Sequence, residues 1–471
     1  MHQLSEPGDS HNPPDGFHFK AVLTPQGWRQ NVSATLDSNG FFTSLASDNN
    51  PHLLPLIDGY VIPGGTNLHS HAFQRAMAGL GEVRGNPADS FWSWREVMYR
   101  FVAIINPDDL HAIAAKLYME FLKGGFTSVG EFHYLHHAAD GSAYDDPAQM
   151  SVAIIEAAQT AGIALTHLPV FYAHSGFGGA APKPGQARFI HSLDAYAAIL
   201  QSLEKNNSSP LNRLGIAPHS LRAITPDELN TLEDFRKDIL SGGPMHIHIS
   251  EQLREVEDCV AYCAARPVEW LLDNAAIDDS WCLIHATHMT PKETRDLAKS
   301  GAIAGLCPMT EANLGDGIFA AEEFVAAGGR FGLGTDSNIR TNVAEELQML
   351  EYSQRLSKRR RNILADKNNP HVGDSLYQQA ASGGAVALAQ PAGAIEVHRR
   401  ADFIVLDPRL DGVHRHANGR FMDTWVFGAL ERVPKQVYVA GQQLIANCHH
   451  EDEEAIDRDY QRVMEKLLAE I

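Results

Sequence analysis

A chain of 471 residues is too long for one small core and suits a large barrel with a lesser second domain. Its 58 acidic and 38 basic residues give a net charge of −20, a field that repels nucleic acid and anionic membranes. No apolar run reaches membrane-spanning length, and the amino end lacks the basic start and apolar stretch of a signal peptide. Five scattered cysteines argue against a disulfide framework and favour a reducing, cytoplasmic environment.

The two ends of the chain predict a small β-domain. Residues 1–17 are polar and rich in Pro and Gly, so we expect a flexible terminus. Residues 18–60 and 395–448 both read as short strands separated by turns, and the simplest arrangement joins them into one β-sandwich domain. Residues 451–471 carry apolar side chains at helical spacing and predict a helix that packs on its own chain rather than on a second subunit.

Residues 61–394 alternate apolar strands with amphipathic helices, and this predicts a parallel (β/α)8 barrel of the TIM type. The predicted strands are Tyr60–Asn67, Thr127–Tyr134, Ala164–Phe171, Arg213–Pro218, Met245–Ser250, Trp281–His285, Ala302–Leu306 and Arg330–Gly334. The predicted helices include Asp108–Lys123, Pro147–Ala161, Pro226–Leu240, Val256–Asn274 and Pro291–Lys299. Functional residues of such barrels lie at the carboxyl ends of the strands.

His69 and His71 directly follow the first predicted strand. Side chains two residues apart on a strand share a face, so both imidazoles can converge on one metal ion such as zinc. Chance is the alternative reading, because the chain has 24 histidines and His246 and His248 form a second such pair. The case for a metal therefore depends on partners at the ends of later strands.

His248 and Asp336, at the ends of the fifth and eighth strands, complete a predicted set of three imidazoles and one carboxylate. His248 is preferred because it is nearer the strand end, but spacing alone does not exclude His246. The fourth predicted strand has no lysine to bridge two metals, so one divalent ion is expected. Zinc fits best, although iron and manganese accept the same donors.

Two more residues are positioned for proton transfer. Zinc lowers the pKa of a bound water to about 7 and so provides hydroxide at neutral pH. Glu251, three residues beyond His248, can move a proton from that water to a leaving nitrogen. His285, at the end of the sixth strand, can hold or deprotonate the water from another side. We therefore assign Glu251, His285 and the ligand Asp336 to catalysis.

Over nearly its whole length the chain resembles the amidohydrolase superfamily, in its mononuclear deaminase branch. The shared features are a P-G-x-x-N-x-H-x-H opening at Pro63–His71, H-x-x-E at His248 and Glu251, then His285, Asp336 and the segment Ala401–Asp407. Within this branch it resembles the formimidoylglutamate deiminases of histidine degradation, with narrower markers at His71–Ala76, Phe91–Arg95, Glu131–Tyr134 and Ala217–Arg222.

This resemblance implies hydrolysis of N-formimidoyl-L-glutamate to N-formyl-L-glutamate and ammonia. The substrate has two carboxylates, and Arg95 and Arg222 are their implied partners because guanidinium binds carboxylate bidentately. Gln74, Tyr134 and His219 are implied to add neutral hydrogen bonds. Without such roles, Arg95 would stack on a neighbouring tryptophan and Arg222 would form a loop salt bridge.

Two other functions fit the same motifs. A deaminase of a cyclic amidine, such as a purine, pterin or pyrimidine, would use the same metal site without a pair of arginines. A non-catalytic scaffold would have lost ligands, whereas every proposed ligand is present. We further expect a homodimer by base rate, and the Gly- and Pro-rich segment 175–188 is a candidate lid over the site.

Overall fold

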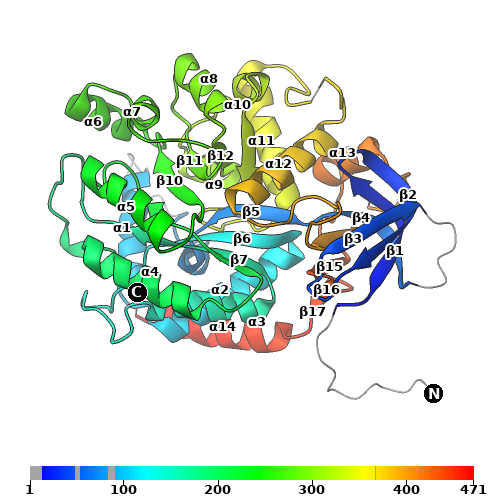
Figure 1. Cartoon of the computed structure of the whole chain (residues 1–471), viewed down its shortest axis with the longest axis horizontal. Helices are drawn as coiled ribbons and strands as arrows, with labels where there is room; N and C mark the ends of the chain where they lie inside the picture. The colour runs from blue at the N-terminus through cyan, green and yellow to red at the C-terminus, as the bar shows by residue number, and fades with distance from the viewer. Residues whose placement is uncertain (1–12, 48–53, 83–90, 366, 411, 471) are drawn as a thin grey trace.

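The computed structural model of this protein describes residues 13–47, 54–82, 91–365, 367–410 and 412–470; of the side chains in residues 91–97 it describes only Arg95. A mainly helical body with a central group of strands lies beside a separate sheet (Figure 1). Of the terminus predicted to be flexible, residues 1–12 lie outside the described residues.

The larger body is a TIM-type barrel of parallel strands. The strands are β5 (Gly65–Ser70), β6 (Phe126–His133), β7 (Ala164–Phe171), β8 (Asn212–Leu214), β9 (Ala217–Pro218), β10 (Met245–Ile249), β11 (Trp281–His285), β12 (Ile303–Leu306) and β13 (Arg330–Leu333). They pair in the order β10-β11-β12-β13-β5-β6-β7-β8, and β9 pairs with β7. Bridges from Ile216 to Met245 and from Ser220 to His248 close the ring between β9 and β10. The eight predicted strands therefore form one closed sheet, in which β8 and β9 share the fourth position.

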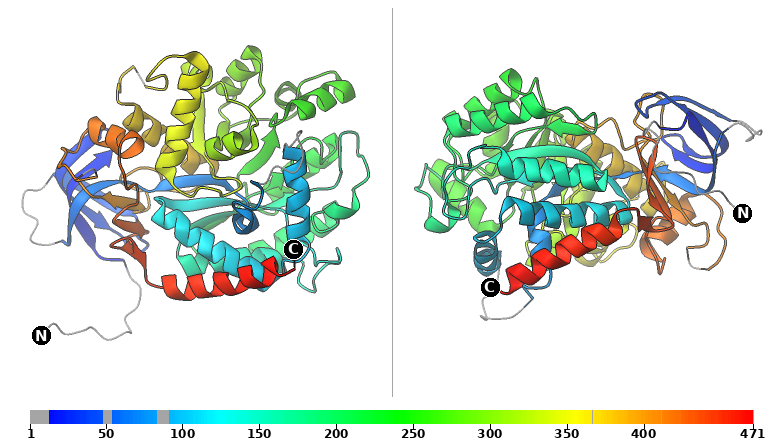
Figure 2. Two further views of the ribbon diagram at one scale, coloured as in Figure 1. Left: turned by 180° about the vertical axis from the view of Figure 1, so that it is seen from behind. Right: turned by 90° about the horizontal axis from the view of Figure 1, so that it is seen from below.

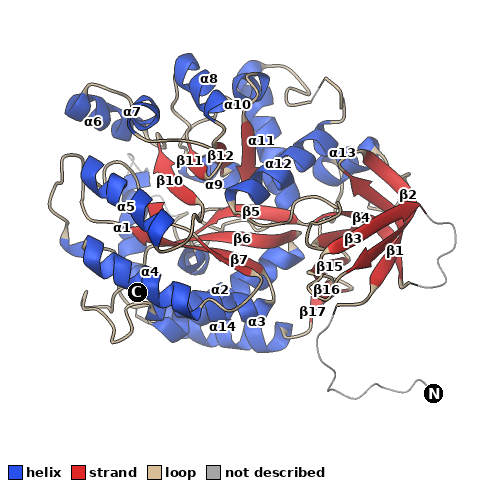
Figure 3. Cartoon of the chain, viewed as in Figure 1, coloured by secondary structure: helices blue, strands red, loops and turns tan. Residues whose placement is uncertain are grey.

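Helices surround this barrel (Figure 3). They are α1 (Phe91–Val102), α2 (Pro107–Lys123), α3 (Gln149–Ala161), α4 (Leu193–Asn206), α5 (Pro226–Asp238), α6 (Leu253–Cys263), α7 (Pro267–Asn274), α8 (Pro291–Ser300), α9 (Pro308–Leu314), α10 (Ala321–Ala326), α11 (Val343–Lys358) and α12 (Val372–Ala387), with short 3-10 helices η2 (Ala72–Met77) and η3 (Pro184–Gln186). Several begin at a capping box with proline in the first turn, as at Asn106, Thr225 and Thr290.

The second body is one continuous sheet of eight strands. These are β1 (Gly16–Thr24), β2 (Gly27–Leu36), β3 (Phe42–Ser47), β4 (Leu56–Pro63), β14 (Phe403–Leu406), β15 (Gln436–Val439), β16 (Gln442–Ala446) and β17 (His449–His450). β4 joins the two ends of the chain, since it pairs with β1 on one side and with β14 on the other. In its core Phe403 stacks on Tyr438 and meets Phe19 edge to face. We propose the two-domain division expected from the sequence, 18–60 with 395–448 and 61–394, but with the β-domain extended to Gly16, Pro63 and His450 because β1, β4 and β17 reach these residues.

Two predicted elements are divided in the structure. The run Tyr60–Asn67 belongs to two sheets, because β4 ends at Pro63 and β5 begins at Gly65. A Cβ at Gly64 would lie 2.1 Å from Oγ1 of Thr127, so only glycine fits where the chain passes between the sheets. The helix predicted over Val256–Asn274 is likewise two helices, because Ala264 takes a left-handed φ of 58° and Pro267 starts α7.

Helix α13 (Gly419–Phe427) packs beside α12, and α14 (Glu453–Leu468) ends the described chain. α14 lies along α2 (Figure 2), and Nζ of Lys466 is 2.8 Å from Oδ2 of the buried Asp109. Nζ of Lys116 also lies 2.6 Å from Oδ1 of Asp457. The carboxyl-terminal helix therefore packs on its own chain. Among the described residues, none of the helices combines the length and the apolar character that crossing a bilayer requires.

Candidate metal centre and substrate pocket

The carboxyl end of β5 carries the first two candidate ligands. His69 lies within the strand, and His71 is the extended residue that precedes η2, with φ −119° and ψ 90°. The backbone N–H of His71 donates to the carbonyl of Asp336 at 3.0 Å, which ties β5 to the loop after β13. The next N–H, of Ala72, donates to Oε1 of the buried Glu131 at 2.6 Å. Both histidines are thus held on a backbone fixed by two neighbouring strands.

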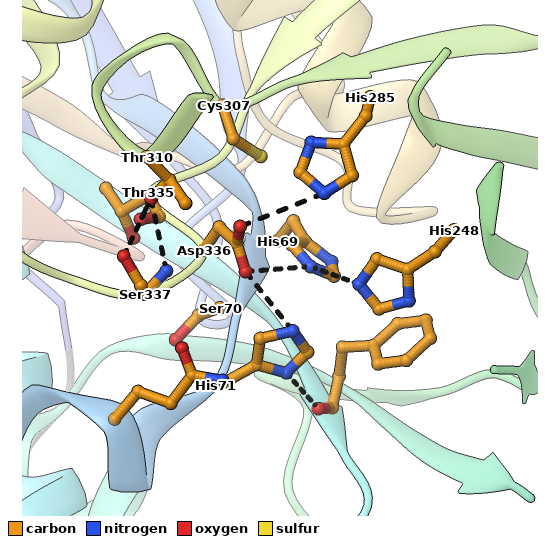
Figure 4. A network of polar contacts seen from close by, with 12 residues as sticks. His69, Ser70, His71, His248, His285, Cys307, Thr310, Thr335, Asp336 and Ser337 are labelled. Carbon is orange, nitrogen blue, oxygen red and sulfur yellow. Dashed lines mark hydrogen bonds and ion pairs between the residues drawn. The ribbon is translucent and has the colours of Figure 1, made fainter. Parts of the chain in front are cut away.

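Four side chains from β5, β10 and the loop after β13 converge on one point (Figure 4). The donors are nitrogen atoms of His69, His71 and His248 and a carboxylate oxygen of Asp336, all buried and all within 4.8 Å of one another. Nε2 of His69 lies 3.1 Å from Nε2 of His248 and 3.5 Å from Oδ1 of Asp336. Nε2 of His71 lies 3.2 Å from the same oxygen. These separations match the edge of a tetrahedron of zinc ligands, about 3.3 Å for bonds of about 2.0 Å.

The hydrogen bonds of the rings show why a cation fits between these atoms. Nδ1 of His71 donates to the carbonyl of Phe132 at 2.8 Å, and Nδ1 of His248 donates to the carbonyl of His219 at 3.0 Å. In a neutral ring the other nitrogen then carries a lone pair, so both Nε2 atoms face their neighbours as acceptors. Burial lowers the pKa of His69 to about 3 and that of His248 well below its usual value, which favours neutral rings. The donor set therefore fits a divalent metal.

His246, which the sequence left open as a ligand, lies elsewhere. Its Nε2 is 2.7 Å from the carbonyl of Ala387, which follows β13 in the chain and belongs to α12. His246 is not among the converging donors, whereas His248, two residues later on the same strand, is. A second group of donors consists of His285, Cys307 and Asp336. It shares Asp336 with the first group, and burial raises the pKa of the Cys307 thiol well above its usual range, so one metal remains our proposal.

Glu251 and His285 face the same space from the ends of β10 and β11. Nε2 of His285 lies 3.9 Å from Oε1 of Glu251 and 3.8 Å from Oδ2 of Asp336, so the nitrogen points between the two carboxylates. Burial acts to lower the pKa of His285, but the carboxylates of Glu251, Glu311 and Asp336 outweigh it and raise the pKa to about 10. Burial raises the pKa of Glu251. The arrangement places an imidazole whose pKa is raised beside a carboxyl group whose pKa is also raised.

Five residues around the site have a left-handed backbone conformation. Ser250, His285, Ala286, Asp336 and Asn338 all have φ between 48° and 68°, a region that residues with a Cβ rarely adopt. Ser250, His285 and Ala286 end or directly follow β10 and β11, while Asp336 and Asn338 lie in the loop after β13, which ends at Leu333. Strained residues of this kind cluster at active sites, where the surrounding hydrogen bonds hold them in place.

A pocket of about 60 Å³ opens over these groups. It brings together His71, His248, Glu251, His285 and Asp336 with the five expected substrate residues Gln74, Arg95, Tyr134, His219 and Arg222. The remaining lining is Met98, Tyr99, Tyr172, Phe189, Leu314 and Ser337. His69 alone among the predicted site residues does not line it. Residues from many different strand ends thus share one cavity.

The expected substrate residues have polar atoms available to a ligand. Nε2 of Gln74 donates to the hydroxyl of Tyr134 at 2.9 Å, while its buried Oε1 has no hydrogen-bond partner among the described residues. Nε of Arg222 is also buried without such a partner. The guanidinium carbon of Arg95 lies 5.3 Å from the centre of the Tyr99 ring, one helical turn later. The tryptophans expected to stack on Arg95 have side chains outside the described residues.

Three buried glutamates support the site, and the sequence assigned a role to none of them, although Glu131 belongs to the marker Glu131–Tyr134. Glu131 holds the backbone after His71, and Oε1 of Glu311 lies 3.2 Å from Nδ1 of His285. The carboxylate of Glu255 accepts the backbone N–H of Ser250 at 3.2 Å and that of Glu251 at 3.1 Å. Glu311 follows the seventh strand, so a survey of every strand end would have included it. Glu255 looks like an ordinary residue of α6, and nothing in the sequence marks its role.

Comparisons with known proteins agree with this geometry. Residues 60–444 match the Amidohydrolase family. The chain is 48% identical over 447 residues to formimidoylglutamate deiminase of Pseudomonas aeruginosa, covering 95% of this chain and 98% of that protein. It is 25% identical over 354 residues to 5-methylthioadenosine/S-adenosylhomocysteine deaminase of Natronomonas pharaonis, covering 75% and 74%. A crystal structure of an amidohydrolase from Brucella melitensis superposes with a TM-score of 0.90 at 45% identity, over 96% of this chain and 99% of that one. This chain belongs to the amidohydrolase family.

Proposed function

We propose that this protein is a metal-dependent deiminase that hydrolyses N-formimidoyl-L-glutamate to N-formyl-L-glutamate and ammonia in histidine degradation. The observation that carries the proposal is one pocket that combines two arginines with the His-His-His-Asp group. A dianionic substrate needs local cations, because the protein as a whole has a net charge of −20. The 48% identity to the deiminase of Pseudomonas aeruginosa supports the same substrate.

We propose His69, His71, His248 and Asp336 as the ligands of one divalent metal. Three nitrogens and one carboxylate suit zinc, which leaves room for water in catalytic sites. When bound, such an ion would lower the pKa of water to about 7 and polarise the group under attack. The hydrogen bonds to Phe132 and His219 would fix the orientation of two of the ligand rings.

The proton transfers fall to Glu251 and His285. Glu251 takes the two protons of the attacking water in turn, one on attack and one as the C=O bond forms, and delivers both to the leaving nitrogen, so that the =NH group departs as ammonia. Burial raises its pKa, which favours the protonated form that donates to nitrogen. His285, held at Nδ1 by Glu311, directs Nε2 at the oxygen on which negative charge develops. Asp336 supports this orientation from 3.8 Å.

Arg95 and Arg222 bind the two carboxylates of the substrate. Each charge-assisted contact contributes about 1.5–3 kcal/mol. The free Oε1 of Gln74 accepts a hydrogen bond from the substrate, and Tyr134 and His219 fix its orientation. Glu255 holds Glu251 in place through the backbone.

A second candidate is deamination of a cyclic amidine, favoured by the aromatic wall of Tyr99, Tyr134, Tyr172 and Phe189. The test is a comparison of substrates on metal-loaded protein. We expect kcat/KM for N-formimidoyl-L-glutamate to exceed that for 5-methylthioadenosine, a pterin and a pyrimidine by at least about 10³-fold, since unpaired arginines penalise neutral rings. A preference for any of the rings would favour the second candidate.

A further inference from the structure

A larger cavity of about 510 Å³ adjoins the pocket and shares Arg95 and Arg222 with it. Its other charged residues are Lys183 from the segment 175–188 and Arg254 and Asp258 from α6. Small and apolar residues complete the lining: Ser175, Gly176, Phe177, Ala261 and Tyr262. The two arginines proposed to bind substrate therefore stand at the boundary between an inner and an outer space.

The lining of the outer cavity is mainly cationic, whereas the protein as a whole is strongly acidic. Four cationic side chains and one carboxylate line it, in a protein with 20 more acidic than basic residues. A hollow lined by one sign of charge focuses the field and raises the local concentration of oppositely charged ligands. Lys183 is exposed, and Arg254 keeps 66% of its side chain exposed, so both are open to an approaching anion.

We propose that the outer cavity captures the dicarboxylate substrate before it reaches the inner pocket. Lys183 and Arg254 attract a carboxylate of the substrate from solution. Arg95 and Arg222 then bind it at the boundary between the two spaces. Among the described residues that line the cavity, Asp258 carries the carboxylate, and its Oδ2 lies 3.7 Å from Nε of Arg254, where it weakens this field. This inference rests on the proposed function, because the ligand it needs is the dianion.

The other reading of Arg254 is an ordinary surface ion pair with Asp258, four residues later on α6. Exposed pairs of this kind contribute little to stability. That reading predicts no effect on catalysis when Arg254 or Lys183 loses its charge. Capture predicts a loss that depends on salt, because exposed charges are screened over about 10 Å at 0.1 M salt.

The test compares two double variants with equal loss of charge. The first, Arg254→Gln with Lys183→Gln, removes two cations from the cavity. The control, Arg462→Gln with Lys237→Gln, removes an exposed arginine 3.7 Å from Asp459 and an exposed lysine 3.8 Å from Glu233, both on other helices. We measure kcat and kcat/KM for N-formimidoyl-L-glutamate from about 0.02 M to about 0.5 M NaCl.

For the cavity variant we expect kcat/KM to fall at least about threefold at low salt and to converge with wild type at high salt. Its kcat should stay within about twofold of wild type, because the captured state precedes the reaction. The control should match wild type, and Asp258→Asn should raise kcat/KM at low salt. Equal kcat/KM in both double variants would overturn the capture site. So would a loss that persists at high salt and also lowers kcat. Either result would leave the proposed function standing. No ammonia from the wild type would overturn the proposed function, and the inference with it.

Discussion

Nδ1 of His285 lies 3.2 Å from Oε1 of Glu311, while Nε2 on the other side of the ring points between Glu251 and Asp336. The same oxygen of Glu311 accepts the backbone N–H of Cys307 at 3.0 Å, so the carboxylate itself is held in place. Glu311 thus orients the imidazole and, together with Glu251 and Asp336, raises its pKa.

Glu311→Gln should lower kcat about 10- to 100-fold, as loss of supporting partners does at metal sites. It should also shift the basic limb of the pH–rate profile to lower pH, because Glu311 helps to raise the pKa of His285 to about 10. Glu465→Gln, on the exposed face of α14, is the control. An unchanged pH profile would mean that Glu311 acts on structure only.

Glu251→Gln should lower turnover by at least about 10²-fold, because the amide cannot carry the proton between water and nitrogen. The bound metal should remain, since Glu251 is not among the four proposed ligands. Turnover and metal content are measured on the same preparation, with the exposed Glu257→Gln as the control. Near-normal turnover would remove Glu251 from the proposed role.

Arg95→Met and Arg222→Met should each reduce kcat/KM for the dicarboxylate about 10- to 100-fold, through the loss of a contact of about 1.5–3 kcal/mol. The exposed Arg409→Met should behave as wild type. Steady-state kinetics with N-formimidoyl-L-glutamate provide the measurement. Retention of activity in both pocket variants would contradict recognition of two carboxylates and favour a neutral substrate.

Metal content distinguishes the two histidines of β10. His248→Gln should lose the metal, because His248 is one of four converging donors. His246→Gln should keep it, because Nε2 of His246 is bonded to the carbonyl of Ala387. Elemental analysis of folded, gel-filtered protein measures the stoichiometry, which we expect to be one ion per chain. Loss of metal from both variants alike would leave the assignment unsupported.

The stability of metal-depleted protein should depend on pH through His285. Its pKa is raised from 6.5 to about 10, so the folded state binds this proton more tightly than the unfolded chain does. The contribution to stability is therefore full below about pH 6.5 and is lost as the pH rises through about 10. Thermal unfolding followed across that range should show a falling Tm, with a smaller fall in His285→Gln. Parallel curves for the two proteins would contradict the raised pKa.

Local pattern was enough to predict the barrel, because apolar strands alternate with amphipathic helices along residues 61–394. It failed where the fold depends on distant contacts. Nothing near Gly64 indicates that Pro63 and Gly65 belong to different sheets, because this is decided by the pairing of β4 with β14 and of β5 with β6. Glu255 likewise has a role only in the folded chain, where its carboxylate, carried on α6, accepts the backbone N–H of Ser250 at the end of β10.

The candidate lid, residues 175–188, is a second case in which local sequence pattern does not give the contacts of a segment. Lys183 and Phe177 of the segment 175–188 line the outer cavity, but Arg188 is buried and its Nε donates to the carbonyl of His137 at 2.8 Å. The sequence showed a loop rich in glycine and proline, and the structure shows where it lies. Closure over a substrate stays a prediction, which hydrogen exchange with and without ligand would test.

The most direct test is ammonia release from N-formimidoyl-L-glutamate by zinc-loaded protein, with the second product identified by mass. We expect ammonia and N-formyl-L-glutamate in equal amounts, with activity lost on chelation and restored by the metal. This result would establish the substrate, the bond that is cleaved and the need for metal together. Metal-loaded protein that releases no ammonia from this substrate would contradict the account.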